Sequence, residues 1–137
     1  MKTSKLLMAG LAGGVAYFIL GFLLYGMLMM PYFEKQTTNN VSRGEDMVWW
    51  ALIVGNLFLG FLLAYIFGRW ANIKTFMGGL VGGLVVGVLF AAAIDLTMYG
   101  TSDMMTLPGT FVDIIVNTVM IAISGGVVGM VLGMGKE

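Results

Sequence analysis

The stretch that decides the fold is FMGGLVGGLVVGVLFAAAIDLTMY, residues 76–99. It is apolar over more than the roughly 20 residues that an α-helix needs to cross about 30 Å of hydrocarbon. Small residues recur along it four apart, at Gly79, Gly83, Gly87 and Ala91. The next step on that row is Asp95. Because residues four apart share one face of a helix, the stretch predicts a membrane-spanning helix whose narrow face ends in a carboxyl group.

The rest of the chain has the same apolar character. Of its 137 residues, 59% are hydrophobic and 10% are charged, whereas about a quarter of the residues in soluble domains are charged. Four segments are long enough to span a bilayer, namely residues 6–30, 47–67, 76–99 and 111–133. The first exceeds the roughly 7–15 apolar residues of a signal peptide, so we expect a retained anchor. We predict an all-α integral membrane four-helix bundle, a single domain over residues 1–137 embedded in the lipid bilayer.

The basic residues predict the orientation of this bundle. If successive helices alternate in direction, five of the seven basic residues fall on one side, namely Lys2, Lys5, Arg69, Lys74 and Lys136. Cytoplasmic loops of membrane proteins carry an excess of Lys and Arg. We therefore predict an up-down-up-down topology with both termini cytoplasmic, in the inner membrane of a bacterium.

Composition excludes several classes of function. The chain contains no Cys and no His, so it has no disulfide, no Cys or His metal site and no catalysis by either side chain. Its formal net charge is zero, which gives no basic surface for nucleic acid. The Tyr-Asp and Gly-x-Gly-Asp motifs of membrane aspartyl proteases are also absent. We expect no enzymatic activity, no cofactor, no bound metal and no nucleic-acid partner.

Glycine rows on three predicted helices favour close helix packing. In lipid, helices associate by tight contact, which small residues allow. The glycines that we expect to pack in this way are Gly10, Gly14, Gly79, Gly83, Gly87, Gly125 and Gly129. They offer more packing surface than one small bundle needs, which predicts a homo-oligomer or a larger membrane complex. The favoured function is a non-enzymatic interaction or accessory subunit.

Polar residues within the spans support an alternative function. An ionisable residue inside a membrane usually faces protein or water, and Asp95 lies on the packing row. Asp113 fits the third position of a capping box that begins at Thr110, and we favour that role for it. Three further polar residues would share the outer half of the bundle or its floor, namely Asn117, Asn56 and Tyr25. Together these five predict a polar cleft, as in a small transporter or channel for protons, cations or a small polar solute.

Residues 18–25, FILGFLLY, resemble the first-helix signature of an uncharacterised family of small bacterial four-helix integral membrane proteins. That signature has a mid-helix glycine, here Gly21, followed by an aromatic pair that ends in tyrosine, here Tyr25. Leu24 stands where the family carries tryptophan. The order of helices and the glycine-rich last span are also similar. The resemblance implies the four-helix architecture. It implies nothing about activity, because no activity is assigned to the family.

Overall fold

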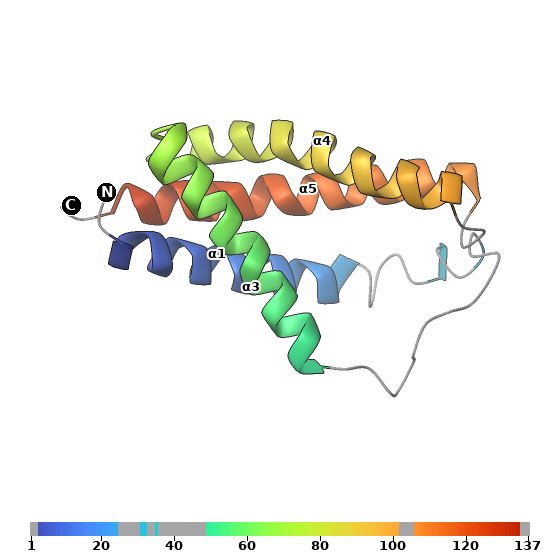
Figure 1. The fold of residues 1–137 in the computed structure, drawn as a ribbon, viewed down its shortest axis with the longest axis horizontal. Helices are drawn as coiled ribbons and strands as arrows, with labels where there is room; N and C mark the ends of the chain where they lie inside the picture. Colours follow the sequence, from blue (N-terminus) through green and yellow to red (C-terminus); the bar gives the residue numbers. More distant parts are fainter. Residues whose placement is uncertain (1–2, 25–30, 33–34, 36–48, 102–105, 135–137) are drawn as a thin grey trace.

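The computed structural model describes residues 3–24, 31–32, 35, 49–101 and 106–134. Its elements are four α-helices and one π-helix (Figure 1), namely α1 (Thr3–Leu23), α3 (Trp49–Tyr65), η3 (Ile66–Trp70), α4 (Phe76–Thr101) and α5 (Leu107–Leu132). The described residues form no strand. Counting η3 as the continuation of α3, four helices are long and apolar enough to cross a membrane. This confirms the predicted all-helical class and indicates a multi-pass membrane protein.

Helix α5 is the centre of the arrangement. It packs against both α4 and α1, whereas α3 packs mainly on α1 (Figure 1). Packed neighbours run antiparallel, since Gly79 near the start of α4 lies against Gly125 late in α5. In the same way, Gly10 early in α1 lies against Phe61 late in α3. As a result α5 is the most buried of the four helices.

The α4–α5 contact is a contact between backbones. A Cβ atom at Gly83 would lie 2.7 Å from the Ile121 carbonyl oxygen and 2.9 Å from Ala122 Cα. At Gly87 it would lie 3.2 Å from the Cα atom of Thr118. Backbone atoms cannot move out of the way as a flexible side chain can. The glycines therefore allow a separation between the α4 and α5 backbones that is too short for a larger residue.

A second close crossing joins α1 to α3. A Cβ atom at Gly14 would lie 2.8 Å from Leu57 Cα, and one at Gly60 would lie 2.8 Å from Gly14 Cα. Helix α5 meets the same point, because a Cβ atom at Gly13 would lie 3.6 Å from both Gly60 Cα and the Ser124 carbonyl oxygen. Beyond this crossing α3 runs obliquely, and its N-terminal half diverges from α4 and α5 (Figure 1).

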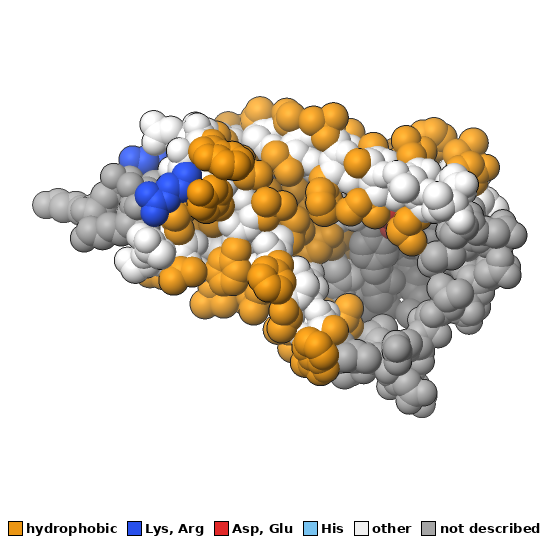
Figure 2. Space-filling model, viewed as in Figure 1, with side chains coloured by type: hydrophobic (Ala, Val, Ile, Leu, Met, Phe, Trp, Pro, Cys, Tyr) orange, Lys and Arg blue, Asp and Glu red, His pale blue; other side chains and the backbone are white. Residues whose placement is uncertain are grey.

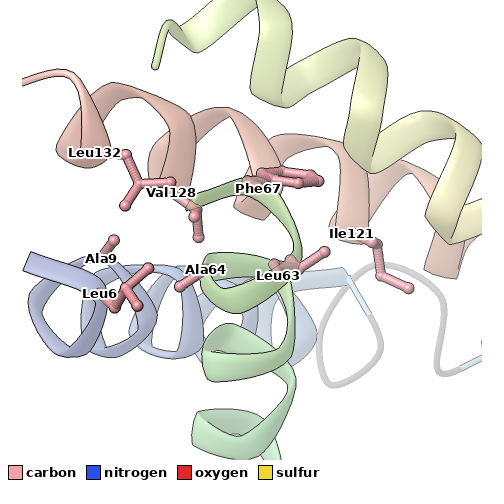
Figure 3. Packing of buried hydrophobic residues seen from close by; sticks show 8 residues of the cluster. All are labelled: Leu6, Ala9, Leu63, Ala64, Phe67, Ile121, Val128 and Leu132. Carbon is pink, nitrogen blue, oxygen red and sulfur yellow. The ribbon is translucent and has the colours of Figure 1, made fainter. Parts of the chain in front are cut away.

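Buried apolar side chains gather at one end of the molecule, where α1 begins and α3 and α5 end (Figure 3). The cluster consists of Leu6, Ala9, Leu63, Ala64, Phe67, Ile121, Val128 and Leu132. Phe67, in η3, is its largest member and is 1% exposed. We call this the packed end. At the opposite end, where α4 ends and α5 begins, most large apolar side chains are exposed.

The predicted start of the last helix is wrong. The sequence suggested a helix over 111–133 with a capping box at Thr110, but α5 begins at Leu107. Thr106 is the capping residue, and its side-chain oxygen accepts a hydrogen bond from the Gly109 backbone N–H at 3.3 Å. Pro108 is tolerated in this first turn because its missing N–H would have no partner there. Asp113 is therefore not a capping residue.

The other predicted boundaries differ by a few residues. The helix expected over 6–30 begins at Thr3, and its expected last turns lie outside the described residues. The helix expected over 47–67 continues through η3 to Trp70, while its expected capping box at 42–45 also lies outside the described residues. The helix expected to end at Tyr99 continues to Thr101, so Asp95 lies deeper in it than the sequence suggested.

Replacing Gly83 with alanine should destabilise the protein. The added Cβ atom would overlap the α5 backbone, and overpacking of this kind costs about 1–3 kcal/mol. That exceeds the roughly 1 kcal/mol by which alanine is favoured over glycine in a helix interior. We expect thermal unfolding in detergent to begin at a lower temperature than in the wild type.

The matched control is Gly100→Ala in the same helix, where a Cβ atom would meet no described residue within 4 Å. This variant should unfold at the wild-type temperature or above it. Equal unfolding temperatures for the two variants would contradict the backbone contact.

Candidate functional site

The register of α4 against α5 brings two acidic side chains together inside the membrane spans. Each step of four residues along α4, from Gly79 through Gly83 to Gly87, is met by a step back along α5. Asp95, two steps beyond Gly87, therefore faces the turn of α5 that carries Asp113. The two carboxyl groups lie close enough to interact electrostatically, and to share a hydrogen bond when one of them is protonated. The row that holds the helices in contact thus also aligns the pair.

The pair lies shallow in the spans. Asp95 is six residues before the end of α4, and Asp113 is six residues after the start of α5. At 1.5 Å per residue, each lies about 9 Å from its helix end. Both side chains are half-buried. They are deep enough to leave the headgroup region but not to reach the middle of the bilayer.

A third helix adds a tyrosine to this pair. The Tyr17 hydroxyl on α1 donates a hydrogen bond to Oδ1 of Asn117, which lies one turn beyond Asp113 on α5. Tyr17 also interacts electrostatically with the carboxyl groups of Asp113 and Asp95. We call Tyr17, Asp95, Asp113 and Asn117 the polar cluster. Its four side chains come from α1, α4 and α5, the three helices that pack around one another through α5.

The cluster differs in membership from the predicted cleft. Asp95, Asp113 and Asn117 are brought together, but Asn56 is not part of the group. The Asn56 side-chain amide donates to the Leu52 carbonyl oxygen of its own helix at 2.5 Å. Tyr25 lies outside the described residues. Tyr17 was missed, because a tyrosine inside an apolar run is common and its partner is 100 residues away in the chain.

The acidic pair is partly accessible in the described structure. Both side chains are half-buried, and carboxyl atoms are visible beside the latter part of α4 in Figure 2. The only acidic residues among those described are Asp95 and Asp113. The Lys and Arg side chains that this face shows gather instead at the packed end (Figure 2).

The geometry of the acidic pair is that of a proton-sharing site. Oδ2 of Asp95 is a buried acceptor that has no hydrogen-bond partner among the described residues. Two adjacent carboxylates also repel each other, and this repulsion favours a proton held between them. One shared proton would supply a donor and remove one negative charge, so the pair has the chemistry to gain and lose a proton.

The cluster offers oxygen atoms alone to a ligand, from two carboxyl groups, one amide and one phenol. Such donors suit hard cations rather than soft metals. Within the described part of the chain, no three His, Cys, Asp or Glu side chains are grouped closely enough to hold a metal ion.

Comparison with models of known protein families, with curated proteins and with solved structures finds no match to this chain. The resemblance of residues 18–25 to a family of small four-helix membrane proteins therefore stays a prediction, and the site must be interpreted from its own geometry.

Proposed function

We propose that this protein is a small transporter or channel that moves protons, alone or coupled to a cation, through the Asp95–Asp113 pair. The observation that carries the proposal is the pairing of these two carboxyl groups on adjacent membrane-spanning helices. Ionisable residues inside spans are costly and mark proton relays and ion pathways. A structural role alone needs no pair of like charges, because an amide or hydroxyl would link α4 to α5 with less repulsion.

The exposure of the cluster also supports this function. A proton-carrying group needs contact with water in at least one state, and the Asp95 and Asp113 side chains are half-buried rather than fully enclosed. The packed end, by contrast, holds the buried apolar side chains. A partly accessible site beside a closed apolar end is an arrangement from which alternating access can start.

The proposed orientation follows from the charges at the packed end. Arg69 lies in η3, and the Lys74 backbone lies against Gly133 just beyond α5. Because Lys and Arg mark the cytoplasmic side, we propose that the packed end faces the cytoplasm of a bacterium. The four spans would then alternate in direction in the inner membrane with both termini inside, and the polar cluster would face outward.

Asp95→Asn should abolish proton movement. The asparagine side chain can still donate to Asp113, so the fold should persist, but the pair can no longer hold a shared proton. The variant would be reconstituted in liposomes that contain a pH-sensitive dye, and a potassium diffusion potential would drive protons inward. We expect acidification to fall to the rate of protein-free liposomes, and the same result for Asp113→Asn.

The matched control is Asn56→Ala, which removes a polar side chain that bonds only to its own helix. It should keep wild-type flux. Wild-type liposomes that acidify no faster than empty ones under either polarity of the potential would overturn the proposal.

A carbodiimide should label the acidic pair chemically. Dicyclohexylcarbodiimide reacts with protonated carboxyl groups in apolar surroundings, and the shared proton makes one of the two groups reactive at neutral pH. We expect one adduct on Asp95 or Asp113, located by mass spectrometry of the purified protein. Denaturation before treatment should abolish this selectivity. An unlabelled pair in the folded wild type would contradict a shared proton.

A second candidate is the interaction or accessory subunit that glycine rows suggest. The seven glycines on which that hypothesis rests contact residues of this same chain. They are therefore not left over for contact with another protein. One observation still favours it. At Gly55, on the diverging part of α3, a Cβ atom would meet no described residue within 4 Å. The exposed side chains of Trp50, Val54 and Phe58 lie near it on the same helix. This face is narrow enough at Gly55 to receive another helix.

If α3 binds a second copy, Gly55→Leu should break the dimer. The leucine would block close approach of a partner helix, and its Cβ atom would meet no described residue of the same chain within 4 Å. Native mass spectrometry of protein released from a mild detergent would show wild-type dimer and variant monomer. A wild type that is monomeric, or a variant that stays dimeric, would count against this candidate.

A further inference from the structure

Ser124 is a fully buried hydroxyl group that the fold leaves without a hydrogen bond. Its side chain is 0% exposed, and its Oγ atom has no partner among the described residues. Hydroxyl groups within helices usually donate to the carbonyl oxygen one turn back. Thr110 and Thr118 on the same helix do so, at 3.0 and 2.7 Å. A buried hydroxyl without such a bond lowers the stability of the fold, so a role other than stability is worth testing for Ser124.

The position of Ser124 connects it to the polar cluster. It lies seven residues beyond Asn117 on α5, or about 10 Å closer to the packed end. Asp113, Asn117 and Ser124 are separated by four and then seven residues, so they fall within about 40° of one another around the helix. This is the side of α5 on which Tyr17 meets Asn117 and on which Gly13 meets Ser124. The three residues thus form a polar stripe that faces α1.

Apolar side chains interrupt the stripe between Asn117 and Ser124. Met120 is 2% exposed and Ile121 is 0% exposed. The terminal methyl group of Met120 reaches α1, where it would lie 3.3 Å from a Cβ atom at Gly21. Methionine has three rotatable side-chain bonds and adapts to irregular spaces. A change of rotamer at Met120 is therefore one motion that would join the two polar parts of the stripe.

We propose that Ser124 is the inner relay of the proton path, which carries a proton from the polar cluster toward the packed end. This inference rests on the proposed function. A hydroxyl group accepts and donates at the same time. When a hydronium ion on the cluster side gives a proton to Oγ, the hydroxyl proton leaves to a water molecule on the other side. One O–H bond forms and one breaks, so Ser124 ends as it began. The absent bond to the helix backbone leaves the hydroxyl free for this exchange.

The test is Ser124→Ala, which removes one oxygen atom and keeps the tight packing with α1. We expect proton flux in the liposome assay to fall by about tenfold or more. Carbodiimide labelling of the Asp95–Asp113 pair should be unchanged, because the outer site remains intact. The unfolding temperature should stay the same or rise, since the variant loses an unsatisfied buried group and no bond. A serine that serves packing alone would leave the flux unchanged.

Thr118→Ala is the matched control, because it removes a buried hydroxyl from the same helix whose bond is already made to Ile114. It should keep wild-type flux. Wild-type flux in Ser124→Ala, with flux lost in Asp95→Asn, would overturn the relay and leave the proposed function standing. A large fall in the unfolding temperature of Ser124→Ala would also overturn it, because the hydroxyl would then have a structural partner. Absence of flux in the wild type would overturn both.

Discussion

The contact between the α4 and α5 backbones is the constraint on which the rest of the structure depends. Gly83 and Gly87 bring the two helices so close that their relative register is fixed. In a membrane no hydrophobic effect draws helices together, so shape and close approach have to supply the association. The same register continues past the glycines to Asp95, which it sets against Asp113. The same backbone contact therefore assembles the helix pair and places two acidic side chains next to each other, which is unfavourable in free energy.

Stability and chemistry are separated along the molecule. The packed end holds the buried apolar cluster around Phe67 and the crossing of α1 with α3. The polar cluster lies toward the other end, where α3 diverges and the faces of the helices are more exposed. A well-packed half can anchor the helices while the open half moves, which is the division expected where a site must change its access to water. Ser124 lies between the two halves, as the polar group closest to the packed end on the stripe.

Much of the architecture was predictable because membrane spans are defined by length and apolar content, both of which are visible in the sequence. The four-residue row that includes Asp95 also correctly pointed to a packed face. Spacing alone, however, does not say which helix receives that face, and it could not show that Asp95 meets Asp113. The capping role expected for Asp113 was wrong because Thr106 and Pro108 start α5 a full turn earlier. Asn56 was predicted as a site residue because it is polar and lies in the middle of a span. The sequence could not show that its side-chain amide donates to a carbonyl oxygen of its own helix. Tyr17 gave no signal, because its partner is distant along the chain.

The lengths of the helices carry a consequence for the surrounding lipid. Helices α4 and α5 each contain 26 residues. At 1.5 Å per residue each is about 39 Å long. A hydrocarbon layer of about 30 Å is thinner than this, so the pair must tilt or thicken the lipid around it. Because the backbones of the two helices are in contact, this hydrophobic mismatch acts on both helices together, so a change in bilayer thickness would alter the depth of both acids at once.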